Sequence, residues 1–357
     1  MKIAGIESYP ASTSIDVPYR WRDGMQGSPS SIDTTWMRVV TDAGVDGWGP
    51  IDRGPMGSDL VQRVLAPSFT GLDALNREAA WELIWEIDRT EEFPSYALGA
   101  VDIALWDIAG KVAGLPLYQL LGGYRDSIPA YASTATFGSV AEYLDVADQC
   151  LQAGFRAIKL HAWGDARRDA QLCAALREHV GDGIDLMYDG LSAFTLPDAV
   201  YLGRALEASG YRWYEEPMLE FGTRHYTRLC DELEIPVLAP ETADGVHFTA
   251  AQWLIDGAAD LLRTGSDYRG ITGSMRVAHL ADSFHTMAEV HGGGEISRHL
   301  ACAVKNNSYY EAMILTNPIV VEDGISADGC ISPPDGPGIG WDIDLARLRA
   351  GAGPHRQ

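Results

Sequence analysis

Three acidic residues, each at the end of a short apolar run, carry the strongest chemical signal in this sequence. Asp189 lies in DLMYDG, Glu215 in RWYEEP and Glu241 in PVLAPET, and the two intervals between them are both 26 residues. A strand, its helix and two loops use about that much chain, so the carboxylates fall at the C-terminal ends of successive parallel strands. Converging carboxylate oxygens suit Mg²⁺, which keeps positions open for substrate oxygens. The spacing therefore predicts a magnesium site. The alternative is that acidic residues merely end strands in an acid-rich chain.

A lysine and a histidine lie together at the end of a fourth run. In RAIKLHA, strand alternation puts Lys159 and His161 on the same face, pointing inward. A lysine in such a place needs negative charge beside it, from the carboxylates or from an anionic substrate. A histidine can take or give a proton near neutral pH. The pair predicts proton transfer beside the metal, with an ordinary Lys and His at a strand end as the alternative.

Two further residues approach the same place from later runs. His291 ends MAEVHG, five strands after Lys159, and Glu311 lies in SYYEAMIL on the last run. A cation flanked by titratable groups on two sides fits removal of a proton next to a carboxylate, because the cation stabilises the enediolate that develops. We expect Glu311 to hydrogen-bond the substrate, unless it simply faces water. Glu216, next to Glu215, is expected to support the metal ligands and not to bind the metal itself.

The elements that position these residues repeat along the chain. From Ile128 onward the chain contains eight short apolar runs, and an amphipathic stretch follows most of the first seven. Strand and helix alternating at a near-constant period predict an α/β fold, a modified TIM barrel of the (β/α)₇β type. The runs are IPAYAS, RAIKLHA, DLMYDG, RWYEEP, PVLAPE, DLLRTGS, MAEVHG and YYEAMIL.

The first 125 residues read differently and predict an N-terminal α+β capping domain. Residues 2–12 and 34–49 look like strands, the second with a hairpin turn, and residues 76–89 and 95–114 look like helices. Polar, Gly- and Pro-rich loops are expected at 17–31 and 50–59, where loops of this length often cover a site. From the first of these loops we expect Arg20, Trp21 and Arg22 to meet the distal end of the substrate.

The rest of the chain completes the expected domain organisation. Residues 126–320 form the barrel catalytic domain. Residues 321–357 form a Gly-, Pro- and Asp-rich segment that is expected to return to the capping domain. A chain of 357 residues exceeds the usual size of one hydrophobic core, which agrees with two domains.

Bulk properties narrow the partners and the compartment. The formal net charge of −23 disfavours nucleic acid and anionic membranes, which need clustered Lys and Arg. A small anionic substrate can still bind where a metal and a few buried cations reverse the local field. Five widely spaced cysteines without a CxxC pair indicate a reducing compartment and no zinc site. With no secretory signal and no apolar run of membrane-spanning length, we expect a cytoplasmic protein.

One segment resembles a known family. SYALGAVDIALWDIAGKVAGLPLYQLLGG (95–123) is similar to the signature helix and turn of the enolase superfamily, and the later constellation resembles its mandelate racemase subgroup. The resemblance implies one Mg²⁺ on the three carboxylates, Lys159 near the substrate carboxylate and His161 in the proton-transfer position. It also implies His291 as the acid/base on the opposite face and Glu311 as a carboxylate near the substrate. It implies a homo-oligomer as well, often an octamer.

Two departures from the subgroup bear on the chemistry. The aspartate that usually orients the histidine falls on Thr264 or Gly265 in DLLRTGSDYRGITG, and Asp267 is expected to lie too far along the loop. His291 is therefore expected to lack a carboxylate partner and to be a weaker base, suited to helping a hydroxyl leave. The asparagine often found two residues after the first metal ligand is replaced by Leu191.

These observations together predict a lyase, an acid-sugar dehydratase. A base, His161 or Lys159, would remove the proton α to the carboxylate of an aldonate or aldarate, or of its lactone. His291 would protonate the departing β-hydroxyl, giving a 2-keto-3-deoxy acid. The alternatives are an isomerase, either a racemase or epimerase or a sugar-lactone cycloisomerase, and a catalytically silent metal- and anion-binding barrel.

Overall fold

The apolar runs after residue 127 form the strands of a barrel. The computed structural model describes residues 1–91 and 95–354, without the side chains of residues 91, 95, 96, 98 and 266–268. The strands are β4 (Ile128–Thr134), β5 (Ala157–His161), β6 (Asp185–Asp189), β7 (Tyr214–Glu215), β8 (Val237–Leu238), β9 (Leu262–Thr264), β10 (Ala288–Val290) and β11 (Tyr310–Ile314).

These strands lie in chain order around the barrel. β11, β4, β5, β6, β7 and β8 are neighbours in that sequence and the pairs are parallel. A parallel bridge between Leu238 of β8 and Leu261 places β9 next to β8, and β9 pairs with β10. Tyr131 on β4, Met187 on β6 and Trp213 just before β7 lie in one fully buried cluster.

One helix follows each strand except the last, which confirms the predicted (β/α)₇β barrel. The helices are α6 (Val140–Gln152), α7 (Ala166–Val180), α8 (Leu196–Ala208), α9 (Thr223–Glu232), α10 (Val246–Ile255), α11 (Ser266–Ser283) and α12 (Glu295–Ala303). Side-chain caps fix two of the starts: Ser139 accepts from the Glu142 amide, and Asp165 accepts from the amides of Arg167 and Arg168.

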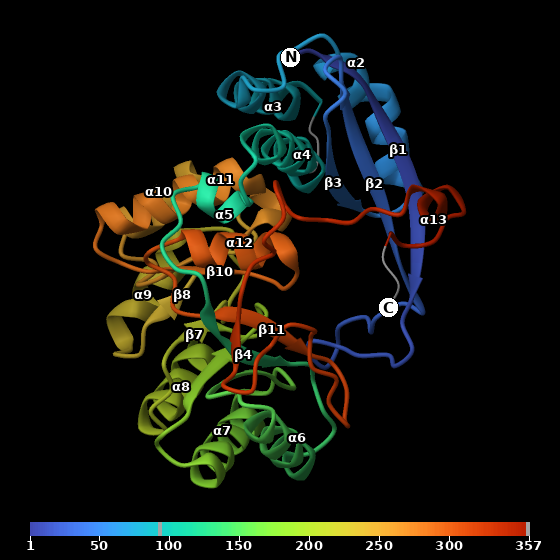
Figure 1. The fold of residues 1–357 in the computed structure, drawn as a ribbon. Coiled ribbons are helices and arrows are strands. Elements are labelled where there is room, and N and C mark those ends of the chain that lie inside the picture. The colour runs from blue at the N-terminus through green and yellow to red at the C-terminus, as the bar shows by residue number, and fades with distance from the viewer. Residues whose placement is uncertain (92–94, 355–357) are drawn as a thin grey trace.

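The N-terminal part is an antiparallel sheet with helices packed on it (Figure 1). Its elements are β1 (Ile3–Ser14), β2 (Ser31–Thr41), β3 (Asp46–Asp52), α1 (Pro55–Leu60), a π-helix (Val61–Leu65), α2 (Ala66–Phe69), α3 (Arg77–Glu91), α4 (Ser95–Ala113) and α5 (Leu117–Leu120). Gly47 and Gly49 on β3 let α4 approach closely. A Cβ at either position would lie 2.1 or 2.2 Å from a carbonyl oxygen of α4.

Of the two long loops predicted in this region, the first is present and the prediction of the second is wrong. Residues 15–30 contain no helix or strand, as expected. The second loop, predicted at 50–59, shrinks to a tight turn, because β3 continues to Asp52 and α1 begins at Pro55. Gly54 takes a positive φ of 49° there, and Pro55 has the fixed φ that suits a first helical residue.

The C-terminal segment returns to the N-terminal part, as the sequence indicates (Figure 1). It first contributes β12 (Cys330–Ile331), antiparallel to β4, and later α13 (Leu345–Arg349). Leu348 of α13 packs in one cluster with Ala11 and Trp48 of the N-terminal sheet. The domain boundaries at 125 and 320 stay predictions.

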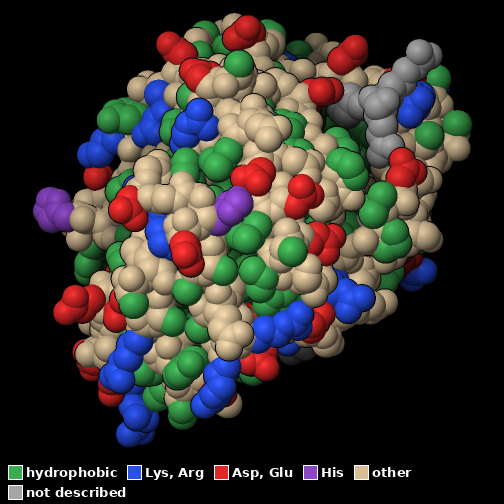
Figure 2. Space-filling view, turned by 90° about the horizontal axis from the view of Figure 1, so that it is seen from below, with side chains coloured by type: hydrophobic (Ala, Val, Ile, Leu, Met, Phe, Trp, Pro, Cys, Tyr) green, Lys and Arg blue, Asp and Glu red, His purple; other side chains and the backbone are tan. Residues whose placement is uncertain are grey.

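The surface carries both signs of charge. On the face in Figure 2, basic side chains are interspersed with acidic ones. Among the described residues, no helix is long and apolar enough to span a membrane.

Candidate active site

The three predicted metal ligands lie together at the C-terminal ends of β6, β7 and β8. Asp189 and Glu215 are directly paired in the register of β6 and β7, and Glu241 follows β8 by three residues. Lys159 Nζ lies 3.2 Å from Asp189 Oδ2 and 2.9 Å from Glu215 Oε2. Glu216 supports the third ligand, because its Oε1 accepts a hydrogen bond from the Glu241 amide at 2.9 Å.

Arg263 on β9 is a charged residue of the site that the sequence reading missed. Its Nε lies 2.7 Å from Glu215 Oε1 and 3.6 Å from Glu241 Oε2. Its Nη2 lies 2.5 Å from Glu311 Oε2. The only available signal was an arginine inside the apolar run DLLRTG, where a buried cation requires a buried anion.

Glu311 is held inside the barrel and does not face water. It is 1% exposed, and its Oε1 lies 2.9 Å from Lys159 Nζ. The Ser133 hydroxyl and the Gly292 amide donate further hydrogen bonds to its two oxygens, each at 2.8 Å. Burial alone would raise the pKa of Glu311, but the charges of Lys159 and Arg263 outweigh it and hold that pKa well below its usual range.

The carboxylates around Lys159 keep its amino group positively charged. Burial disfavours its charge, but the carboxylates of Glu215 and Glu311 outweigh burial and hold its pKa well above the usual value. Lys159 is 1% exposed and packed among three carboxylates, so it is suited to attracting an anionic substrate and not to taking up a proton.

His161 has one ring nitrogen fixed and the other facing the carboxylates. Its Nδ1 lies 2.8 Å from the Thr134 carbonyl oxygen, which can only accept, so Nδ1 carries the proton. Its Nε2 lies 3.1 Å from Asp189 Oδ2. Nε2 is therefore the nitrogen that can exchange a proton in the site.

His291 has carboxylate neighbours, so the expectation that it lacks such a partner is wrong. Its Nδ1 lies 3.1 Å from Glu241 Oε2 and 3.6 Å from Glu311 Oε2. Burial lowers its pKa, but the Glu241 carboxylate outweighs burial and raises the pKa to about 9. The side chain of Asp267, the other candidate partner, lies outside the described residues.

Close packing explains why no acidic side chain stands directly beneath His291 on β9. A Cβ at Gly265 would lie 2.9 Å from the Cβ of His291, and Thr264 is fully buried with its hydroxyl donating to the Ser274 carbonyl. The subgroup's usual aspartate position is thus occupied by residues that pack. Leu191, which also departs from the family pattern, contacts the first metal ligand through its backbone, because its amide donates to Asp189 Oδ1 at 2.9 Å.

A cavity of about 210 Å³ joins most of these groups. It is lined by Trp21, Lys159, His161, Asp189, Leu191, Glu241, His291, Glu311 and Met313. Glu215 and Arg263 are fully buried and are not among the lining residues. The barrel thus brings the predicted proton-transfer residues and two of the metal ligands to one small enclosed space.

The ligand set fits a magnesium ion by donor type, because Asp189, Glu215 and Glu241 supply carboxylate oxygens. Buried Glu215 Oε1 accepts no hydrogen bond from the described residues, and its charge is balanced by Arg263 Nε at 2.7 Å. In the described part of the chain, no three acidic, cysteine or histidine side chains already stand in a metal-holding arrangement. Lys159 and Arg263 already pair with these carboxylates, so a bound metal would share the carboxylates with two resident positive charges.

Of the three predicted cap residues, one reaches this cavity. The ring of Trp21 lies over that of His161, with a centroid separation of 4.8 Å. Arg20 pairs with Asp23 at 3.6 Å and lines a separate cavity. The stem of Arg22 packs on Gly164, where a Cβ would lie 2.7 Å from Arg22 Cδ. Substrate contact by these two arginines stays a prediction.

Family models match both parts of the chain. The model described as enolase C-terminal domain-like matches residues 142–347, and the mandelate racemase / muconate lactonizing enzyme N-terminal domain matches residues 26–122. The chain belongs to the enolase superfamily. The predicted resemblance is confirmed.

Several proteins are similar to this chain along most of their length. The 3,6-anhydro-alpha-L-galactonate cycloisomerase of Streptomyces coelicolor is 30% identical, with 94% of this chain and 95% of the relative covered. The arabinonate dehydratase of Saccharolobus solfataricus is 28% identical, with 79% and 80% covered. The crystal structure of a D-glucarate dehydratase from Agrobacterium tumefaciens complexed with magnesium covers 100% of both chains, with 31% identity and a TM-score of 0.89.

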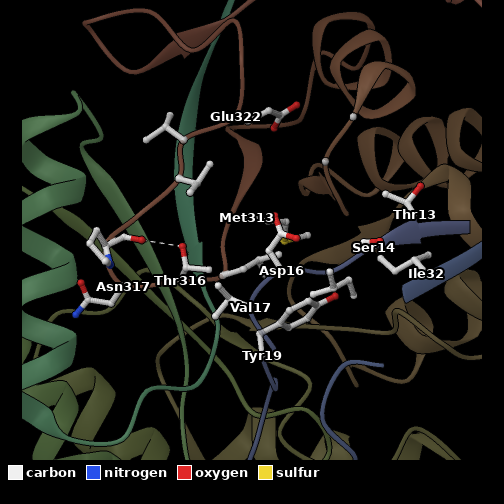
Figure 3. A pocket seen from close by; sticks show the side chains of 17 residues that line it. Thr13, Ser14, Asp16, Val17, Tyr19, Ile32, Met313, Thr316, Asn317 and Glu322 are labelled. Carbon is white, nitrogen blue, oxygen red and sulfur yellow. Dashed lines mark hydrogen bonds between the residues drawn. The ribbon is translucent and has the colours of Figure 1, made fainter. Parts of the chain in front are cut away.

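This enolase superfamily member has a second, larger cavity of about 890 Å³ between cap and barrel. Val17 and Tyr19 come from the segment after β1, and Thr316 and Asn317 from the segment after β11 (Figure 3). Met313 lines both cavities. The larger cavity therefore meets the enclosed one at the Met313 side chain.

Proposed function

We propose that this chain removes the proton α to the carboxylate of an acid sugar and eliminates water to give a 2-keto-3-deoxy acid. The observation that carries the proposal is the pair His161 and His291 in one cavity, on strands separated by β11 and β4 on the shorter way around the barrel. One can act as base and the other as acid on the same small molecule. Relatives named as dehydratases of arabinonate and glucarate support the substrate class.

Each side chain has a defined part in this proposal. Lys159 attracts the substrate carboxylate, and His161 Nε2 takes the α-proton because its Nδ1 is held by Thr134. His291, whose Nδ1 lies 3.1 Å from the Glu241 carboxylate, gives its proton to the departing β-hydroxyl. The C–H and C–O bonds break, water leaves, and the enol becomes the 2-keto acid. Held by Asp189, Glu215 and Glu241, Mg²⁺ would supply positive charge that favours the enediolate.

Exchange of the α-proton tests this division of labour. His161→Asn should abolish both ketoacid formation and deuterium uptake at the α-carbon in ²H₂O. His291→Asn should retain deuterium uptake but lose ketoacid formation by about 10²- to 10⁴-fold. A library of acid sugars supplied with Mg²⁺ should give a semicarbazide-reactive product with the wild type. If neither product nor α-deuterium appears with any acid sugar, the proposal fails, and the silent barrel remains.

A cycloisomerase is the second candidate, favoured by the relative of that name that matches 94% of this chain. The same base and acid would then open a ring, with the ring oxygen leaving in place of a hydroxyl. Supplying lactones and anhydro acids beside the open-chain acids distinguishes the two. Uptake of α-deuterium without any ketoacid would instead indicate the racemase or epimerase.

We further propose one magnesium ion per subunit, a homo-oligomer with an octamer as one form, and a cytoplasmic location. Neighbouring structures contain magnesium, which supports the choice of metal. Light scattering of the purified protein tests the oligomer, and metal analysis tests the stoichiometry.

A further inference from the structure

Arg263 occupies the centre of the acidic cluster beneath the enclosed cavity. Its side chain is fully buried on β9, and Nη1 donates to the Val290 carbonyl at 3.2 Å. Nη2 donates to the Tyr131 hydroxyl oxygen at 3.0 Å. These two hydrogen bonds and three neighbouring carboxylates hold the guanidinium in place. Its position therefore does not depend on a bound ligand.

The buried charges around Arg263 are mostly negative. Asp189, Glu215, Glu241 and Glu311 are four buried carboxylates, and the cations beside them are Lys159, Arg263 and, when protonated, His291. A net negative charge remains, and it attracts a divalent ion. Since like charges repel strongly in a buried site, each resident cation also weakens the attraction for the metal.

We infer that Arg263 is a built-in counter-ion that holds Glu215 and Glu311 in place when no metal is bound, and that its charge lowers the affinity of the site for a divalent ion. The inference rests on the proposed metal site. Arg263 is a positioning residue, because it contacts the carboxylates and lies beneath the cavity lining. Removing its charge should make the folded protein depend more on the metal, because the carboxylates then lack a counter-charge without it.

Metal binding and stability, measured without any substrate, test the inference. Mn²⁺ is titrated into metal-free wild type, Arg263→Gln and Arg263→Lys, and the free-ion EPR signal gives the Kd and the number of bound ions. Arg263→Gln should bind Mn²⁺ at least about tenfold more tightly than the wild type. Its melting temperature should fall in EDTA and rise more than the wild type's on addition of Mg²⁺. Arg263→Lys keeps the charge and should stay within about threefold of the wild-type Kd.

Each outcome decides between the inference and the site on which it rests. Asp189→Asn is the control: loss of Mn²⁺ binding there shows that the titrated ion occupies this site. If the wild type binds no Mn²⁺, or Asp189→Asn binds it unchanged, the proposed metal site fails. If the control behaves but Arg263→Gln binds Mn²⁺ no more tightly than the wild type, the inference alone is overturned. Should Arg263→Gln fold in neither buffer, a tenfold change of Kd in Arg263→Lys would overturn it.

Discussion

At the scale of single residues, Trp21 is the contact through which the cap reaches the chemistry. It lies on a segment without helix or strand, yet its ring covers His161 at a centroid distance of 4.8 Å. An aromatic ring in this position can exclude water from the imidazole and limit the positions that it takes. We therefore expect the cap to contribute to the reaction and not to act only as a cover.

Shortening Trp21 should reduce activity without unfolding the barrel. Trp21→Ala is expected to lower kcat/KM about tenfold, because an aromatic contact of this kind is worth roughly 0.5–1.5 kcal/mol and the ring also excludes water. Trp21→Phe keeps a ring over His161 and should retain most of the activity. Steady-state kinetics on the substrate found by screening measures both. Wild-type kcat/KM in Trp21→Ala would contradict the assigned contact.

Much of the site could be predicted because chemistry and strand period coincide. Residue type and equal spacing identified three of the candidate residues, Asp189, Glu215 and Glu241. Alternation along one strand identified Lys159 and His161. Arg263 could not be found in the same way. A buried guanidinium is recognised only when the carboxylates that neutralise it are known to surround it, and that depends on the barrel closing.

At the scale of elements, the junction of α4 with α11 joins cap to barrel. The carboxylate of Asp102 on α4 accepts from the Thr272 amide at 2.8 Å and from its hydroxyl at 2.5 Å. Trp106, also on α4, donates its ring N–H to the same hydroxyl at 2.8 Å. Gly270 makes this approach possible, because its φ is 63° and a Cβ there would lie 2.6 Å from Asp102 Oδ2.

Gly270→Ala should therefore weaken the junction. The side chain would strain a positive φ and collide with a buried carboxylate, so we expect the free energy of unfolding to fall by about 2–4 kcal/mol. Gly183→Ala is the matched control, since a Cβ there meets nothing within 4 Å and should change stability by less than about 0.5 kcal/mol. Chemical denaturation measures both variants. Equal stability of the two would show that α11 can move away from Asp102 at little cost.

The elements were predictable where their apolar pattern was regular. All eight apolar runs of the barrel form strands. β7 and β8 are only two residues long, and the evenly spaced Glu215 and Glu241 indicated where they end. The loop expected at 50–59 failed because Gly and Pro were read as loop residues. In this chain Gly54 supplies one positive φ and Pro55 starts a helix, so the same residues make a short turn.

At the scale of the whole molecule, one buried histidine ties three parts of the chain together. His299 on α12 is fully buried; its Nδ1 accepts from the Tyr118 amide at 3.2 Å, and its Nε2 donates to the Ile339 carbonyl at 3.1 Å. Barrel, α5 and C-terminal segment meet at this ring. The bond from the Tyr118 amide requires an unprotonated Nδ1 and hence the neutral ring, and burial lowers the pKa of His299 to about 4.

This histidine should make stability depend on pH. Its contribution to the free energy of unfolding is complete above about pH 6.5, the ordinary pKa of histidine in an unfolded chain. It is lost as pH falls toward 4, because the unfolded chain takes up the proton first. The full effect is roughly 3 kcal/mol. In His299→Gln the free energy of unfolding should be lower at pH 7.5 but fall less between pH 6.5 and 4. His279→Gln, at an exposed position, should keep the wild-type slope; a wild-type slope in His299→Gln would exclude the assignment.

The contact of α13 with β1 has a consequence for the order in which a newly made chain can fold. Ala11 and Trp48 precede the barrel in the chain, and Leu348, which packs with them, follows it. During synthesis the N-terminal sheet therefore stays incompletely packed until the barrel residues have left the ribosome. The cap can complete its packing only after the barrel has been made.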